Sequence, residues 1–298
     1  MCLTKAGRSI YSILDNFHIG SKLSLLSGQV QPMSGGGNRA ACQICEGTPK
    51  DPPKGRVRRC SFSSFREVNV IDRNEACELL LVSRNYLYQL LYKAFAREPD
   101  KAFLELLTSE TTRGCFELLG VGIPEELSAG LTRLRGKADD AAFTERLREE
   151  YTRLFVGPLE MDAPPWESVY VGEEGMLFQE STLQVRACYH RFGLLPEEYP
   201  RVADDSLALE LGFMAELARR AADAFGAGDA ETLDAALRGA RDFLKEHLLV
   251  WVPLLAERAG KTGTAPLYPQ LLRILDSFLK QDRETLNDLL SEGVHAHD

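Results

Sequence analysis

Apolar side chains that recur every three or four residues are the feature that most constrains the fold of this chain. This spacing lines one face of an α-helix and predicts amphipathic helices that pack together. The helical sets begin after Asn74 and comprise Leu80, Leu87, Leu91, Ala94 and Phe95; Phe143, Leu147, Tyr151, Leu154 and Phe155; Val185, Cys188, Tyr189 and Phe192; Leu207, Leu211, Met214 and Ala218; Leu233, Leu237, Ala240, Leu244 and Leu248; and Tyr268, Leu271, Leu272, Leu275 and Phe278. Only the short stretch 168–171 alternates in the manner of a strand. We therefore predict an all-α fold.

The first 70 residues have a different composition from the rest. Glycine fills residues 35–37 and proline recurs at positions 49, 52 and 53, with little apolar periodicity between them. Such a segment cannot bury enough apolar surface to offset the entropy lost on ordering. We predict that residues 1–70 form a disordered extension and that residues 71–298 form one helical bundle of about ten helices. The break at residues 193–200 is a candidate hinge between two helical halves.

Composition and charge exclude several classes of function. The chain is 44% hydrophobic and 27% charged, as in ordinary globular proteins, and its formal net charge is −9. A general nucleic-acid binder needs a basic face, so no nucleic-acid partner is expected. No apolar run reaches the roughly 20 residues that span a bilayer, and Asp15, Asn16 and His18 interrupt any N-terminal signal sequence. We predict a cytoplasmic protein without membrane insertion.

The seven cysteines do not form the pattern of a disulfide framework, because their number is odd and no secretory signal precedes them. Cys42 and Cys45 form a CxxC pair with Cys60 nearby. A structural zinc ion takes four ligands, and His18, the nearest histidine, lies beyond the glycine run. We expect free thiols and no metal, with a zinc-dependent interaction protein through Cys42, Cys45 and Cys60 as an alternative.

A proline-rich loop follows the helix that ends near Phe155. The sequence reads Tyr-Thr-Arg-Leu-Phe-Val-Gly-Pro over residues 151–158 and Ala-Pro-Pro-Trp-Glu-Ser-Val-Tyr over residues 163–170. Proline fixes backbone angles and lacks an N–H, so this loop should be stiff and extended. Trp166 and Tyr170 in such a loop are suited to capturing a peptide at a surface groove. The alternative is that both aromatic side chains fill the core.

Acidic residues open the helix that follows the hinge. Asp204, Asp205 and Ser206 are residue types that cap a helix N-terminus. Glu210 lies one turn later on the apolar face and needs a partner, in an ion pair or in a ligand contact. The three acids could also form a carboxylate site of a small hydrolase. No nucleophile with an adjacent base, phosphate loop or HExxH motif accompanies them, and His247 is expected to be a satisfied core residue at a helix end.

Four blocks of sequence together resemble a known family. They span residues 151–170, 177–193, 203–214 and 243–253. In this order and spacing they resemble the TorD/DmsD family of cytoplasmic chaperones, which mature molybdenum-containing redox enzymes. The resemblance covers residues 71–290 and implies a TorD-like helical fold without catalytic residues.

The resemblance also implies a function. The chain would bind the twin-arginine leader, the body, or both, of a molybdopterin-containing oxidoreductase catalytic subunit and hold it for cofactor insertion before export. Some relatives bind guanine nucleotide, but this chain has no phosphate loop, so we assign no cofactor. Relatives also exchange helical halves, so a monomer that can form a domain-swapped dimer is expected.

The resemblance implies particular leader-binding residues. They are Tyr151, Leu154, Phe155, Pro165, Trp166, Tyr170, Asp205, Ser206 and Glu210. The family usually has Asp-His at the hinge. Asp205 matches the acid and could pair with a leader arginine, whereas Ser206 replaces the histidine, which argues against a role for a titratable imidazole at that position.

Overall fold

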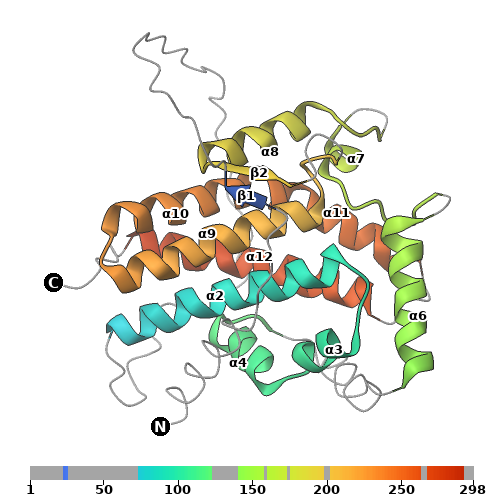
Figure 1. The fold of residues 1–298 in the computed structure, drawn as a ribbon, viewed down its shortest axis with the longest axis horizontal. Coiled ribbons are helices and arrows are strands. Elements are labelled where there is room, and N and C mark those ends of the chain that lie inside the picture. Colours follow the sequence, from blue (N-terminus) through green and yellow to red (C-terminus); the bar gives the residue numbers. More distant parts are fainter. Residues whose placement is uncertain are drawn as a thin grey trace, which may run out of the picture.

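The computed structural model describes residues 23–25, 73–122, 140–157, 160–172, 175–197, 202–262 and 267–291. Most of these residues are helical and only two three-residue strands occur among them, so the all-α prediction is confirmed (Figure 1). The elements in chain order are β1 (Leu23–Leu25), α2 (Arg73–Ala96), α3 (Lys101–Leu107), α4 (Glu110–Leu118), α6 (Ala141–Tyr151), the π-helix η2 (Thr152–Val156), α7 (Glu167–Val171), α8 (Glu180–Arg191), β2 (Leu194–Pro196), α9 (Leu207–Ala227), α10 (Ala230–Phe243), the π-helix η3 (Leu244–Leu248), α11 (Leu249–Gly260) and α12 (Tyr268–Ser291).

The core lies where five helices meet. Helix α9 packs against α2 and α10, and α12 packs against α10 and α11 (Figure 1). The apolar stripes predicted from sequence face this core: Leu87, Leu211 and Leu275 are fully buried. Burial of such side chains, each stabilising by about 1.5–3 kcal/mol relative to exposure, is what holds the bundle together.

One buried ion pair joins α2 to α12. The guanidinium of Arg84 forms a bidentate pair with the carboxylate of Asp282, in which Nη2 donates to Oδ2 over 3.0 Å. The Tyr88 hydroxyl donates to the same Oδ2 over 2.6 Å. Burial opposes the charge on Arg84, but the attraction of Asp282 outweighs it, so the pKa of Arg84 is raised. Removing either charge would leave the other buried without its partner.

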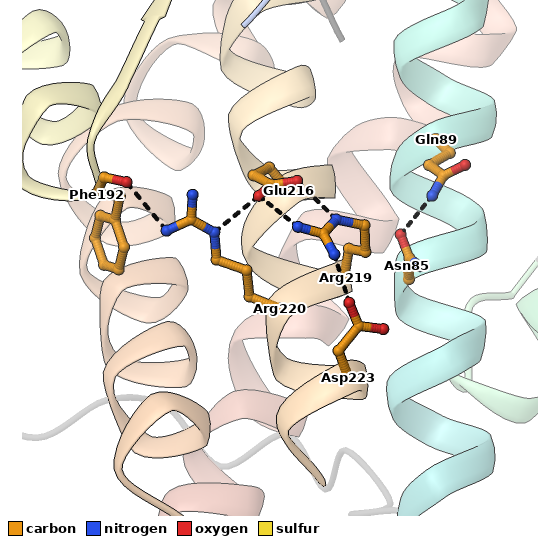
Figure 2. Close-up of polar contacts among 7 residues, drawn as sticks. All are labelled: Asn85, Gln89, Phe192, Glu216, Arg219, Arg220 and Asp223. Carbon is orange, nitrogen blue, oxygen red and sulfur yellow. Dashed lines mark hydrogen bonds and ion pairs between the residues drawn. The ribbon is translucent and has the colours of Figure 1, made fainter. Parts of the chain in front are cut away.

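Helix α9 also holds the end of α8. Arg220 donates from Nη1 to the Phe192 carbonyl over 3.0 Å and from Nε to Glu216 over 2.8 Å (Figure 2). Burial disfavours the charged form of Glu216, yet the hydrogen bonds from Arg219 and Arg220 prevail and lower its pKa. The Phe192 ring lies against Gly239 of α10, where an added Cβ would come within 2.2 Å of the ring. The residues just before the predicted hinge are therefore anchored to both α9 and α10.

The stretch 168–171 is helical, so its interpretation as a strand is wrong. It belongs to α7, the short helix Glu167–Val171. The Asp205 carboxylate accepts a hydrogen bond from the Ser168 amide at the start of this helix, over 2.8 Å. This contact comes from a distant part of the chain and satisfies an amide that a helix start otherwise leaves unpaired. A local alternation of residue types cannot reveal it.

A small antiparallel sheet lies beside the bundle. Strand β1 pairs with β2 in the register Leu23 to Pro196 and Leu25 to Leu194. Strand β1 belongs to the segment 1–70, whose other residues lie outside the described part of the chain, as do Cys42, Cys45 and Cys60. The disordered extension and the domain boundary therefore stay predictions. Among the described residues, no helix is both long and apolar enough to cross a membrane.

Candidate functional site

Two segments far apart in the sequence run side by side at the start of α7. The Leu207 amide donates to the Pro165 carbonyl over 2.9 Å, and the Glu167 amide donates to the Asp205 carbonyl over 3.0 Å. Between these bonds, Trp166 and Ser206 form an isolated antiparallel bridge. The proline-rich loop and the acidic helix start, which the sequence singled out separately, are therefore one structural unit.

The Asp205 carboxylate lies inside this unit, fully buried. Oδ2 accepts from the Ser168 amide over 2.8 Å, and Oδ1 accepts from the Thr182 hydroxyl over 3.0 Å. Asp205 therefore ties α7 and α8 to the start of α9. It caps α7 rather than its own helix, because the N-cap of α9 is Ser206, whose hydroxyl accepts from the Leu209 amide over 3.4 Å.

Asp204 has separate partners. Its Oδ2 accepts from Arg186 Nε and Nη2 over 2.9 and 2.6 Å, and its carbonyl accepts from the Tyr189 hydroxyl over 2.9 Å. Asp204 and Asp205 thus serve different neighbours instead of converging on a shared ligand. No group of three or more metal-ligating side chains gathers as a metal site in the described part of the chain, so the geometry lends no support to a carboxylate hydrolase.

Glu210 and Trp251 lie on the inner side of the unit. The indole Nε1 donates to Glu210 Oε2 over 3.0 Å, and both side chains are fully buried. Glu210 therefore finds its partner in an indole N–H rather than in a basic side chain. Burial, and then the nearby charge of Glu167, raise the pKa of Glu210 well above its usual range.

The Glu167 carboxylate forms a hydrogen-bonded pair with the imidazole of His247. The imidazole Nδ1 lies 3.0 and 3.2 Å from the two Glu167 carboxylate oxygens, and Nε2 lies 3.8 Å from Cys188 Sγ. Burial opposes a charged imidazole, but the hydrogen bonds with Cys188 and Glu167 outweigh it and raise the pKa of His247 to about 9. His247 is a satisfied core residue, as predicted, and it carries a charge that links α7 to η3.

The residues implied by the family resemblance divide into two groups by exposure. Pro165, Trp166, Tyr170 and Ser206 are half-buried at the surface of the unit. Tyr170 stacks on the buried Trp251, with ring centroids 5.6 Å apart.

The remaining implied residues are buried, namely Tyr151, Leu154, Phe155, Asp205 and Glu210. The Tyr151 and Phe155 rings both pack on Tyr268, and the Tyr151 hydroxyl donates to the Phe95 carbonyl over 3.0 Å. The structure thus brings Trp166, Asp205 and Ser206 together and places Tyr151 and Phe155 in the aromatic core.

Next to this unit lies a set of exposed apolar side chains that the sequence reasoning missed, which we name the apolar patch. Helix α7 contacts both α8 and α11, and the patch residues stand on these elements and on the α7–α8 connection. They are Val171, Met176, Leu177, Phe178, Leu183, Val250 and Leu254. The Phe178 side chain is 60% exposed, and its backbone has φ 59°, a left-handed conformation uncommon for a bulky residue. The signal in the sequence was the apolar run Met176–Phe178 in a loop after two glycines.

Comparison with known proteins identifies the family. A family model described as the nitrate reductase delta subunit matches residues 122–257, which contain every residue discussed above from Tyr151 to Trp251. A protein described as chaperone protein TorD, from Vibrio cholerae serotype O1 (strain ATCC 39541 / Classical Ogawa 395 / O395), is 30% identical over 168 residues, or 56% of this chain and 73% of that relative. A chaperone protein TorD from Shewanella pealeana is 27% identical over 235 residues, or 76% of this chain and 95% of that relative.

The helical bundle and these matches define a chaperone-type protein with an all-α fold. The chain belongs to the TorD/DmsD family, and the resemblance of its sequence blocks is confirmed.

Proposed function

We propose that this chain is a non-catalytic cytoplasmic chaperone for the catalytic subunit of a molybdopterin-containing oxidoreductase. It binds the client's twin-arginine leader and holds the subunit for cofactor insertion before export. The observation that carries the proposal is the set of exposed apolar side chains on α7, α8, α11 and the α7–α8 connection, where α7 contacts both of the other helices. Exposed apolar side chains gathered on one surface are typical of a protein interaction site.

The leader's apolar segment docks on the patch as an amphipathic or apolar helix, a mode in which side chains spaced by a turn fill a hydrophobic surface. Val250 and Leu254 are themselves one turn apart on α11, with 47% and 43% of each side chain exposed. Trp166 and Tyr170 border this surface as half-buried aromatic anchors. Pro165 and Ser206 complete the border.

The buried residues among those implied by the family resemblance act by holding the surface residues in place. The core side chains that support the proline-rich loop are those of Tyr151, Leu154 and Phe155. The Asp205 carboxylate holds the start of α7, and the Glu210 side chain holds the Trp251 ring, on which Tyr170 stacks. Asp205 is fully buried, so a leader arginine could reach its carboxylate only if α7 moved away from the start of α9. The exposed carboxylate of Glu180, at the start of α8 between Phe178 and Leu183, can meet an arginine without such a movement.

Calorimetric titration with a synthetic twin-arginine leader peptide tests the proposal. Phe178→Ala and Leu183→Ala should each weaken binding by more than about 1 kcal/mol, or about fivefold in Kd, if they form the anchor surface. Val156→Ala is the matched control, because this side chain is similarly exposed (54%) but stands on η2, outside the patch. Equal affinity for all three variants and the parent chain would contradict the assignment of the patch.

The arginine contact is tested separately. Glu180→Gln keeps the size of the side chain and removes its charge, so it should weaken binding of the twin-arginine peptide and leave binding of a peptide with both arginines replaced by glutamine unchanged. Equal losses for the two peptides would show that Glu180 does not meet the arginines. The chain is proposed to act as a monomer, with exchange of helical halves about residues 193–200 as its route to a dimer.

A further inference from the structure

One thiol of the described chain stands at the end of a line of polar side chains. Cys188 is on α8, His247 is in η3 and Glu167 opens α7, so three separate elements meet there. His247 Nε2 lies 3.8 Å from Cys188 Sγ, and Nδ1 lies 3.0 Å from Glu167 Oε2. A thiol beside an imidazole that a carboxylate orients is an arrangement found in activated nucleophiles.

Exposure distinguishes this thiol from two others. Cys188 is partly exposed, whereas Cys77 and Cys115 are 3% and 1% exposed. Burial raises the pKa of Cys115 to about 12, so it stays protonated and inert. Cys188 is therefore the most accessible of these three cysteines.

The carboxylate determines which nitrogen faces the sulfur. Glu167 accepts the Nδ1–H, so Nε2 points at Cys188. Glu167 also favours the charged imidazole, and a positive charge beside a sulfur favours the thiolate, which is the form that attacks a disulfide. His247 is nearly fully buried, so this charge is little screened by solvent.

We propose that Cys188 is a thiol modification site, activated by the Glu167–His247 pair, that forms mixed disulfides with small disulfides of the glutathione type. In the reaction, Sγ attacks one sulfur of the reagent, the reagent's S–S bond breaks, and a new S–S bond to Cys188 forms. The second half of the reagent leaves as a thiol and takes up the proton that Cys188 loses. Cys188 is oxidised and the leaving half is reduced, so no further oxidant is required.

Thiol exchange at Cys188 requires neither the client nor its leader. A purely structural role for Glu167 and His247, holding α7 to η3, predicts that Cys188 reacts no faster than any partly shielded cysteine. The two roles predict different rates of disulfide exchange at Cys188 Sγ, and this rate can be measured without any binding assay.

The experiment treats the full chain with oxidised glutathione at pH 7 and follows each cysteine-containing peptide by mass spectrometry. Cys188 of the folded protein should react at least about fivefold faster than Cys188 of the same protein unfolded in urea, because only the fold supplies the charged imidazole. A folded rate equal to or below the unfolded rate would overturn the proposal, and this comparison requires no variant.

A variant adds a second test. Glu167→Gln keeps a hydrogen-bond acceptor for Nδ1 and removes the charge, so the rate at Cys188 should fall at least about fivefold while its melting curve shows that the chain is folded. Glu149→Gln, the same chemical change at an exposed position of α6, is the matched control and should leave the rate within twofold. An unchanged rate in folded Glu167→Gln would likewise overturn the proposal.

Discussion

Replacing Asp205 is the sharpest test of how the site is held together. Its carboxylate accepts two hydrogen bonds, from the Ser168 amide over 2.8 Å and from the Thr182 hydroxyl over 3.0 Å, and it is fully buried. Bonds to a charged acceptor stabilise by about 1.5–3 kcal/mol each, and a buried donor left unpaired costs about 1–3 kcal/mol. Asp205→Ala should therefore lower the free energy of unfolding by about 3–5 kcal/mol.

Asp205→Asn should cost less, about 1–2 kcal/mol, because the amide can still satisfy both neighbours. Its oxygen accepts from the Ser168 amide, and its NH2 group donates to the Thr182 oxygen once that hydroxyl rotates. Urea unfolding of both variants, followed by helical circular dichroism, gives the two values. An Asp205→Ala loss below about 1 kcal/mol would refute the reasoning that this carboxylate holds α7 and α8 to α9.

The same asparagine variant also tests direct recognition of the leader. Because Asp205→Asn keeps the shape of the unit, a loss of about 1.5–3 kcal/mol in leader binding would point to a lost contact with an arginine. That loss should then disappear against a peptide whose two arginines are glutamine. Additive losses in this cycle would leave Asp205 with a positioning role alone.

Four further changes probe other parts of the molecule. Trp166→Ala should weaken leader binding by more than about 1 kcal/mol with little change in melting temperature, whereas a stability loss of about 3–5 kcal/mol would mark the ring as a core side chain. Asp282→Ala should cost about 3–5 kcal/mol in urea unfolding, because it strands a buried guanidinium on α2, and a loss near zero would contradict this. Gly239→Ala should destabilise by about 1–3 kcal/mol because the added methyl meets the Phe192 ring, and a more stable variant would show that the ring moves aside freely. Because the pKa of His247 is raised to about 9, its charged form stabilises the fold by about 2–3 kcal/mol below about pH 6.5, and this contribution is lost as the pH rises towards 9. In His247→Gln, the free energy of unfolding should no longer fall over this pH range. An unchanged pH dependence in that variant would show that other groups cause it.

The helices and their buried faces were predictable from sequence. A spacing of three and four is a local property, and it located the inner faces of α2, α9 and α12 through residues such as Leu87, Leu211 and Leu275. The family could be recognised for a related reason, because its sequence blocks keep their order along the chain. The burial of His247 also followed from its place on an apolar face.

The partners of the polar side chains were decided by tertiary structure alone. Ser168 lies 37 positions from Asp205, and His247 lies 80 positions from Glu167, so no local pattern can connect them. The short helix α7, mistaken for a strand in its sequence, depends on one of these distant contacts. The elements that carry the exposed apolar side chains likewise meet only in the tertiary structure, where α7 contacts both α8 and α11. Periodicity within a helix determines which face is buried, but the packing of whole helices determines which charges, thiols and apolar side chains meet.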